Sequence, residues 1–270
     1  MAKFDGKYLT GTAGPTVYKR YRNMQLVTAK SRLSKETQTE NTKRAAAQFG
    51  VSSRLAADLR KNFENIVTDF YDGTMVYRFK TLVQQSLRPA LDRDSGNYQF
   101  TTNSFEKLNG FEFNINSPVM NTFFVLPVQT INGNILKISI PEMYVSEDIC
   151  FPRKASSCML NVAVGMYDLH NGYKSLCPVQ SIEIGNDKSN DVIPAQELTF
   201  EIEPGCLCIS MFSFQFIQKT FSGNLIMNSK QFNPAAVFRA VIADGVVDKG
   251  RTEKWQPIVF GNDGGYSKKA

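Results

Sequence analysis

The sequence of 270 residues predicts an α+β protein, in which a basic N-terminal arm or hairpin and a small helical cluster precede an antiparallel β-sandwich. Three observations support this class. Basic residues gather in the first third of the chain, apolar residues recur there at helical spacing, and later apolar residues form short runs typical of strands. The expected segments are an arm or hairpin (1–35), a helical region (36–95), an all-β domain (96–260) and a flexible tail (261–270).

The charge of the chain is unevenly distributed. Residues 1–95 contain 17 Lys or Arg against 9 Asp or Glu, whereas the rest of the chain contains 14 against 16. This change of composition, together with the turn-rich stretch LDRDSGN at 91–97, marks the expected boundary between the helical region and the β domain. A cationic segment is typical of contact with a polyanion or with an acidic protein surface.

The arm contains the sequence GTAGPTVYKRYRNMQLVTAK. Gly11 and Gly14-Pro15 are turn-forming residues, and a second turn is expected at Arg22-Asn23. Apolar and cationic side chains are mixed between these turns, which favours a β-hairpin or an extended arm over a helix. The candidate residues for binding another subunit or a polyanion are Val17, Tyr18, Lys19, Arg20, Tyr21, Arg22, Lys30 and Arg32.

Three helices are expected in the helical region. The segment KETQTENTKRAAAQFG at 35–50 predicts a polar and then alanine-rich helix that ends at Gly50. Apolar residues at steps of three or four predict a second helix over 51–70, with two serines in the capping position near its start. A third pattern follows Gly73 and stops at Pro89. Its apolar side comprises Met75, Phe79, Leu82 or Val83, and Leu87. These helices are expected to form a small antiparallel cluster.

Strand signals begin near residue 97. The segment NYQFTTNSFEKLNGFEFNINS at 97–117 alternates, with a turn expected at LNG, and Asn132-Gly133 between two β-rich runs is a strong hairpin signal. No helical crossover of sufficient length separates the later runs, so antiparallel pairing in a sandwich is expected. The later runs are CMLNVAVGMYDL, VQSIEIGN, ELTFEIEPGCLCISMFSFQFIQ, VFRAVIADGVV and WQPIVF.

The residue pattern argues against most enzymes, and no cofactor is predicted. The only histidine, His170, is the one imidazole that could activate a serine or cysteine nucleophile, and a surface turn is the alternative interpretation. Signatures of nucleophile elbows, phosphate loops and zinc proteases are absent from the sequence. Glu201 and Glu203 share one face of an expected strand, which fits a glycosidase pair or simply an outward-facing surface.

The five cysteines form no obvious disulfide framework. Cys206 and Cys208 are expected on one face of a strand, as half of a metal site or, alternatively, as small buried side chains in a reducing compartment. No complete metal site is predicted. The absence of a leader-like or long apolar run predicts a chain without a membrane span, made in the cytoplasm, with a virion as a further location.

The N-terminal third contains an ordered pattern: Gly11, Gly14, Val17-Tyr18 and Arg20, then a turn, Val27, the polar segment 35–50 and SSRLAADLR. This pattern resembles that of a group of uncharacterised proteins from Bacteroidota and their phages. In that group a Gly-x-x-Gly hairpin ending in basic residues precedes a helix with Gln and Arg before a Phe. This chain departs from the pattern at the turn, where Asn23 replaces a glycine. Because the group has no established activity, the resemblance implies no catalytic residue and mainly a structural role.

These observations favour a non-enzymatic structural or assembly subunit of a large particle or filament, with a phage virion as one setting. The arm would dock on other protein subunits, identical or different, by strand addition and charge complementarity. Two alternatives stay open. One is a nucleic-acid-binding module that uses the basic aromatic arm. The other is a glycan- or ligand-binding β-sandwich with Tyr167, Tyr173 or Trp255 exposed around a groove.

Overall fold

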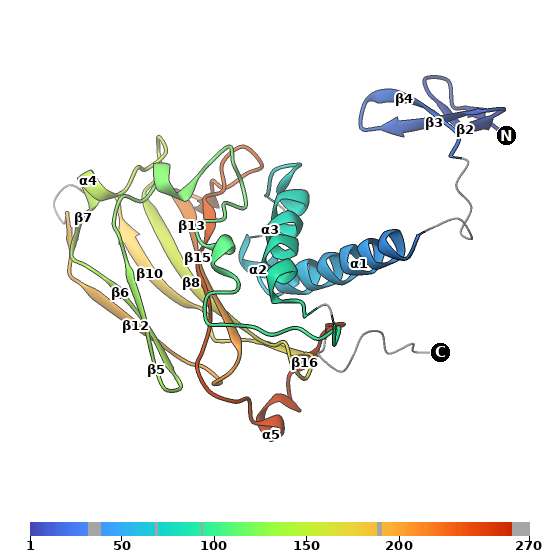
Figure 1. Ribbon diagram of the computed structural model, residues 1–270. Coiled ribbons are helices and arrows are strands. Elements are labelled where there is room, and N and C mark those ends of the chain that lie inside the picture. Colours follow the sequence, from blue (N-terminus) through green and yellow to red (C-terminus); the bar gives the residue numbers. More distant parts are fainter. Residues whose placement is uncertain (32–38, 68–69, 93, 188–190, 261–270) are drawn as a thin grey trace. The chain divides into compact units, whose positions relative to one another are not determined.

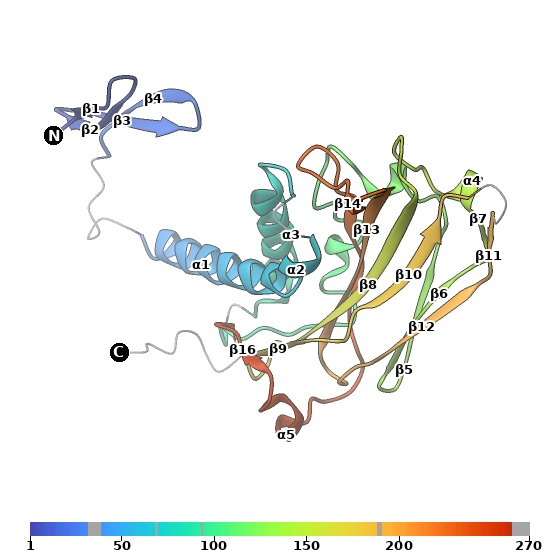
Figure 2. The same cartoon turned by 180° about the vertical axis from the view of Figure 1, so that it is seen from behind.

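A computed structural model describes residues 1–31, 39–67, 70–92, 94–187 and 191–260. The chain forms two compact units, Met1–Ala47 and Gln48–Ala270, each of which is described by itself. Figures 1 and 2 show the elements of the chain from opposite sides. The predicted tail and the first residues of the helix predicted at 35–50 lie outside the described residues.

The N-terminal unit contains a four-stranded antiparallel sheet in which each strand pairs with the next along the chain. The predicted turn at Arg22-Asn23 is confirmed, because Tyr21 pairs with Met24 across it. The predicted arm or hairpin is thus a larger element, a complete four-stranded meander. Its strands are β1 (Lys3–Phe4), β2 (Leu9–Ala13), β3 (Thr16–Tyr21) and β4 (Met24–Ala29).

The second unit is organised around a seven-stranded antiparallel sheet. Strands β8 and β13 lie side by side at its centre, paired from Leu207 with Tyr167 to Ile217 with Ser157. The strands are β8 (Ser157–Asp168), β9 (Tyr173–Leu176), β10 (Gln180–Gly185), β13 (Leu207–Thr220), β14 (Gly223–Ile226), β15 (Ala235–Ile242) and β16 (Gln256–Pro257). Most of the predicted strand runs are confirmed here, although WQPIVF contributes only the two residues of β16.

A three-stranded antiparallel sheet, in the order β12-β6-β5, belongs to the same unit. The predicted hairpin is confirmed, but its turn is Gly133-Asn134 rather than Asn132-Gly133, because Asn132 pairs with Ile135. Gly133 has a φ of 59°, which glycine adopts without steric cost. The strands are β5 (Val128–Asn132), β6 (Ile135–Ile140) and β12 (Gln196–Glu201), and a two-stranded sheet joins β7 (Met143–Tyr144) to β11 (Val192–Ile193).

The predicted helix break at Gly50 is wrong, because α1 (Glu40–Lys61) runs through it. A glycine inside a helix costs about 1 kcal/mol relative to alanine, and the buried stripe of Leu55 and Leu59 beyond it stabilises the continuous helix. Ser52, expected near a cap, instead lies inside the helix, and its Oγ donates to the carbonyl oxygen of Gln48 (2.8 Å). The shorter helices are α2 (Glu64–Val67), α4 (Val145–Asp148) and α5 (Lys249–Thr252).

The third predicted helix is confirmed as α3 (Met75–Ala90), which ends one residue after Pro89. Its buried side is the predicted one, and the choice between Leu82 and Val83 falls on Val83. The helices predicted to form a small antiparallel cluster do not have a core of their own, since the buried residues of α1 and α3 share one core with those of β8 and β13. Residues on both sides of the predicted boundary at residue 95 therefore belong to one compact unit.

The strands predicted at 97–117 are also wrong. Apart from isolated β-bridges, the segment is irregular and contains the 3₁₀ helix η2 (Glu106–Leu108). Phe105, Phe111 and Phe113 are buried, and the ring of Phe111 packs edge-on against Phe79 of α3 with centroids 5.0 Å apart. The apolar spacing therefore reflects aromatic side chains that fill the space between α3 and the sheet.

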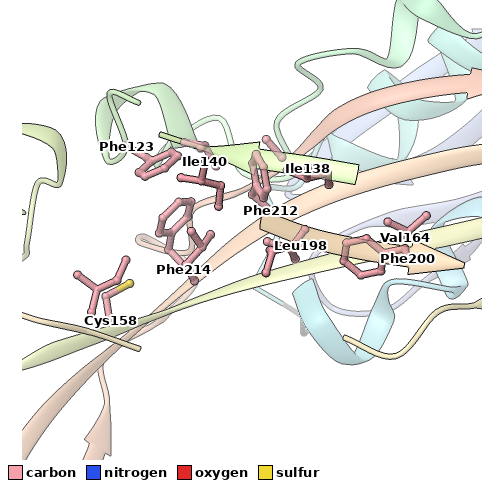
Figure 3. Close-up of a cluster of buried hydrophobic side chains, with 14 of the residues drawn as sticks. Phe123, Ile138, Ile140, Cys158, Val164, Leu198, Phe200, Phe212 and Phe214 are labelled. Carbon is pink, nitrogen blue, oxygen red and sulfur yellow. The ribbon is translucent and has the colours of Figure 1, made fainter. Parts of the chain in front are cut away.

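Two hydrophobic cores draw on alternate residues of the central strands. Phe212 and Phe214 of β13 pack with Ile138 of β6 and Phe200 of β12, as Figure 3 shows. Ile209 and other odd-numbered residues of β13 belong instead to the core shared with α1 and α3. In Figures 1 and 2 helices α1, α2 and α3 lie on one side of the large sheet and β5, β6 and β12 lie on the other. This mixture of helices and antiparallel sheets confirms the α+β class.

Candidate interaction surface on the N-terminal sheet

Most of the predicted binding residues lie close together on the N-terminal sheet. Val17, Tyr18, Lys19, Arg20 and Tyr21 belong to β3, and Arg22 is in the following turn. Lys30 directly follows β4, and its backbone N–H donates to the carbonyl oxygen of Pro15 (2.6 Å). Arg32 lies outside the described residues.

The alternation of side chains along a strand divides these residues between two faces. On β3 and β4, the register pairs Lys19 with Leu26 and Tyr21 with Met24. We call the face that carries these side chains the Lys19 face; its members are Val17, Lys19, Tyr21, Met24, Leu26 and Thr28. The opposite face, the Arg20 face, comprises Thr16, Tyr18, Arg20, Gln25, Val27 and Ala29.

The Lys19 face presents large apolar side chains to its surroundings. Tyr21, Met24 and Leu26 are 44%, 56% and 40% exposed. Across residues 1–31, all of which are described, Tyr8 is the only buried residue. The sheet therefore has almost no hydrophobic core of its own, although three or more strands usually need a buried apolar face to be stable.

The charge of the sheet is strongly positive. Residues 1–31 carry a single carboxylate, Asp5, whose Oδ1 accepts hydrogen bonds from the backbone N–H groups of Tyr8 (2.6 Å) and Lys7 (3.0 Å). These two bonds lower the pKa of Asp5 and tie it to a turn. The cationic side chains are Lys3, Lys7, Lys19, Arg20, Arg22 and Lys30. An acidic partner would be attracted to this sheet.

Arg20 differs from Lys19 because it is part of the sheet's own structure. Its guanidinium lies over the ring of Tyr8, 4.7 Å from the centroid, and its Nε donates to the carbonyl oxygen of Arg22 (3.1 Å). The hydroxyl of Tyr8 donates to the carbonyl oxygen of Asn23 (3.0 Å). Lys19 is therefore the more available of these two predicted cations.

Gln25 joins β4 to β2, a role that no sequence signal indicates. Its Oε1 accepts from the backbone N–H of Leu9 (2.8 Å), and its Nε2 donates to the carbonyl oxygen of Leu9 (2.9 Å). Ladder pairing of β2 with β3 begins at Gly11, which lies inside β2 rather than in a predicted turn. Gly11 has a φ of 105°, and a Cβ there would lie 2.6 Å from the carbonyl oxygen of Met1.

An ionic cluster lies at the start of α3. Burial alone would raise the pKa of Asp72, but hydrogen bonds from Thr74 and Arg78 outweigh burial and lower this pKa to about 2. Nearby, Oε1 of Glu112 accepts from the backbone N–H of Val119 (2.9 Å), whereas its buried Oε2 has no hydrogen-bond partner among the described residues. Burial raises the pKa of Glu112 to about 7.

His170 lies in the turn between β8 and β9. His170 is exposed, and its backbone N–H donates to Oδ1 of the buried Asp168 (3.0 Å). The backbone N–H of Asn171 also donates to this oxygen (2.9 Å). Asp168 thus organises the turn between β8 and β9, because its carboxylate accepts from two backbone N–H groups and from Nδ2 of Asn171 (2.7 Å) rather than from the imidazole.

Cys206 and Cys208 are both fully buried, and burial raises the pKa of each thiol. Cys206 precedes the first residue of β13, and Cys208 belongs to the core that contains Phe212. Among the described residues no group of three or more potential ligands is arranged to hold a metal ion. The small, buried side-chain interpretation therefore fits this pair.

The predicted outward-facing pair of glutamates is wrong for Glu203. Glu201 ends β12 and is exposed, but Glu203 lies beyond the strand and is only 9% exposed. Arg251 donates from Nη1 to Oε1 of Glu203 (2.9 Å). An ion pair therefore explains Glu203, and the two carboxylates do not form a matched surface pair.

The three aromatic side chains predicted to surround a glycan-binding groove are not exposed together. Tyr167 is fully buried, and its hydroxyl donates to the carbonyl oxygen of Leu59 (2.8 Å). Tyr173 is partly buried, and Trp255 is partly buried against the core that contains Phe212. This contradicts the expectation that all three rings are exposed around a groove.

Comparison of the chain with protein-family models, curated proteins and solved structures found no match. The resemblance of the N-terminal third to proteins of Bacteroidota and their phages therefore stays a prediction. No described helix is long and apolar enough to cross a membrane. The geometry and charge of the N-terminal sheet are the basis for assigning a function.

Proposed function

We propose that the protein is a non-enzymatic assembly subunit of a large particle or filament, such as a phage virion, made in the cytoplasm. Its N-terminal sheet would dock on a neighbouring protein subunit. The single observation that carries this proposal is the nearly coreless sheet, in which Tyr8 is the only buried residue of residues 1–31.

So small a sheet buries little apolar surface of its own. Units below about 40 residues usually need disulfides, metals or association. The N-terminal sheet, which lies within residues 3–29, has no cysteine, since the first in the chain is Cys150. Burial of a side chain such as Leu26 or Met24 contributes about 1.5–3 kcal/mol when it is complete. Covering the Lys19 face with another surface would therefore supply the stabilisation that the sheet lacks.

The charge of the sheet limits the kind of surface that it would meet. Six cationic side chains against the single carboxylate of Asp5 favour an acidic partner surface and fast, salt-sensitive association. In this proposal the second unit is the body of the subunit, with its two larger sheets facing each other as a sandwich-type domain. The core shared by β6, β12, β8 and β13 supports that arrangement.

The test is the mass of the purified chain in solution, measured by light scattering over a range of concentrations at low and high salt. We expect oligomers of the full chain and monomers of a variant lacking residues 1–35. High salt should weaken the oligomers because it screens the charges of the sheet. A full-length chain that stays monomeric at every concentration would contradict the proposal.

Nucleic-acid binding is the second candidate, because the cations of the sheet accompany the exposed ring of Tyr21. The measurement is titration of the full chain with single-stranded DNA at several salt concentrations. Binding whose affinity falls steeply with salt, and that is lost in Lys19→Glu, would favour this alternative. Equal binding by a chain lacking residues 1–35 would exclude the sheet as the binding site.

A further inference from the structure

We infer that the N-terminal sheet of one copy docks on a second copy of the chain, at an acidic and apolar surface beside strand β5. This surface, called the β5 surface, comprises Phe124, Leu126, Val128, Glu142 and Glu147. The inference rests on the proposed function and adds the identity and location of the acceptor. It is carried by the exposure, spacing and charge of these residues.

The apolar part of the β5 surface is a strip of alternate residues that leads into an edge strand. Phe124 and Leu126 lie in the irregular segment before β5, and Val128 is its first residue. Phe124, Leu126 and Val128 are 53%, 85% and 59% exposed. Val125, between the first two, is partly buried against the core. Strand β5 is the last strand in the order β12-β6-β5, so its outer side has no paired strand among the described residues. Exposed apolar side chains on an edge strand favour contact with another chain.

The acidic part of the β5 surface adjoins this strip. The backbone N–H of Phe124 donates to the carbonyl oxygen of Asp148 (2.9 Å), which places α4 directly beside the strip. Residues 138–152 contain Glu142, Glu147 and Asp148 and no basic residue; Lys137 before them pairs with Glu197 (3.0 Å), and Arg153 and Lys154 follow them. Asp148 is occupied by the backbone N–H of Tyr144 (2.7 Å). Glu142 and Glu147 are exposed and form no ion pair within the described part of the chain.

The Lys19 face has the complementary chemistry. Its exposed Tyr21, Met24 and Leu26 match the apolar strip, and Lys19 matches the acidic segment in sign. Donor and acceptor surfaces are different regions of the same chain, so the contact is heterologous. Each copy would then use both surfaces, and repetition would build a ring or a filament. This geometry is the reason to choose a second copy as the occupant.

A second exposed apolar site in the same unit lacks this complementarity. The hairpin of β13 and β14 exposes Phe221, Leu225 and Ile226 at 107%, 57% and 53%. Residues 213–232 contain Lys219 and Lys230 and no acidic residue. A cationic sheet would be repelled there, whereas the β5 surface would attract it. The charge therefore selects the β5 surface as the acceptor.

The first experiment disrupts each surface and measures the mass of the intact chain by light scattering. We expect Leu126→Arg on the acceptor and Leu26→Lys on the donor each to weaken association at least tenfold. Val246→Arg is the control for Leu126→Arg, because Val246 is 88% exposed outside the proposed surface. Val27→Lys is the control for Leu26→Lys, because Val27 is 58% exposed on the Arg20 face. Both controls should associate as the natural chain does.

The second experiment exchanges charges between copies. Lys19→Glu and the double variant Glu142→Lys with Glu147→Lys are each expected to be weakly associated alone. Mixed together they should associate again, because the reversed donor of one copy then meets the reversed acceptor of the other. Recovery only in the mixture would support a contact between two copies.

The outcomes separate the inference from the proposed function. If Leu26→Lys dissociates the oligomers but Leu126→Arg does not, and mixing gives no recovery, the sheet is still the connector but the β5 surface is not its acceptor. If the natural chain does not associate at all, the proposed function itself fails. Protection of the Lys19 face from hydrogen exchange in a strictly monomeric chain would likewise overturn docking between copies.

Discussion

The N-terminal sheet and the seven-stranded sheet are both antiparallel, but they are stabilised in different ways. Strands β8 and β13 have both faces buried between two hydrophobic cores, whereas Tyr8 is the only buried residue among residues 1–31. Two sheets with the same antiparallel pairing thus bury very different amounts of apolar side-chain surface. From this difference we expect the second unit to fold by itself and the N-terminal sheet to need further contacts.

The largest expected effect comes from a substitution that creates a cavity in the core of the second unit. Phe214→Ala removes a ring that is 1% exposed, and we expect it to lower the free energy of unfolding by about 3–5 kcal/mol. Urea unfolding followed by fluorescence of Trp255, the only tryptophan, measures this change. Phe221→Ala, at a side chain that is fully exposed, should change the free energy by less than about 0.5 kcal/mol.

A more conservative substitution at the same position keeps the test possible if Phe214→Ala does not fold. Phe214→Leu keeps most of the side-chain volume and should be destabilised by about 1 kcal/mol. By contrast, Leu26→Ala in the N-terminal sheet should leave the unfolding of the second unit unchanged. Equal effects of Leu26→Ala and Phe214→Ala on that unfolding would contradict the distinction between the two sheets.

The next effect is a pH dependence that originates in Glu112. Its pKa is raised from 4.5 to about 7 in the folded chain, so folding retains a proton that the unfolded chain releases near 4.5. The contribution is complete below pH 4.5 and is lost as the pH rises to about 7. We expect this change to lower the free energy of unfolding by up to about 3 kcal/mol, and by less where water screens the carboxyl group. Asp72 adds nothing over this window, since its pKa lies at about 2.

The measurement for Glu112 is the free energy of unfolding in urea at several pH values between 4.5 and 7.5. Glu112→Gln mimics the protonated carboxyl and should remove this part of the decline. Glu106→Gln, at an exposed glutamate of η2, is the matched control and should leave the decline in place. A natural chain that gains stability over this pH range would contradict the assignment.

The smallest effect concerns the turn between β3 and β4. Arg22 has a φ of 54°, a left-handed conformation that costs a residue with a side chain roughly 1–2 kcal/mol and costs glycine little. We expect Arg22→Gly to stabilise the N-terminal sheet by about 1 kcal/mol, seen as slower hydrogen exchange at the amides of β3 and β4. Asn23→Gly is the control, because Asn23 does not have a positive φ. Faster exchange in Arg22→Gly would show that lost contacts outweigh the relieved strain.

The sequence predicts those elements whose side-chain period reports directly on burial. The stripe of Met75, Phe79 and Leu87 predicts the buried side of α3, and the apolar runs around β8 and β13 predict strands. The glycine alone predicts a break at Gly50, which is wrong because buried residues further along α1 stabilise the helix through it. The apolar residues at 97–117 anchor an irregular segment. Their spacing in the sequence cannot be distinguished from the alternation of a strand.

The candidate surface was only partly predictable. The sequence indicates the cations and aromatic residues of β3, but the division between the Lys19 face and the Arg20 face depends on strand register. Met24 and Leu26 gain significance only when the sheet is seen to have no core. The role of Gln25 depends on a contact with Leu9 across a neighbouring strand, which spacing in the sequence does not report.

Strand β13 makes the two cores of the second unit mechanically inseparable. Its even-numbered residues, such as Phe214, are embedded in one core and its odd-numbered residues, such as Ile209, in the other. Pulling the strand out of either core removes it from both, so the unit should rupture in a single event under load. A subunit linked to its neighbours through the N-terminal sheet would therefore yield first at that sheet, with the body of each subunit left intact.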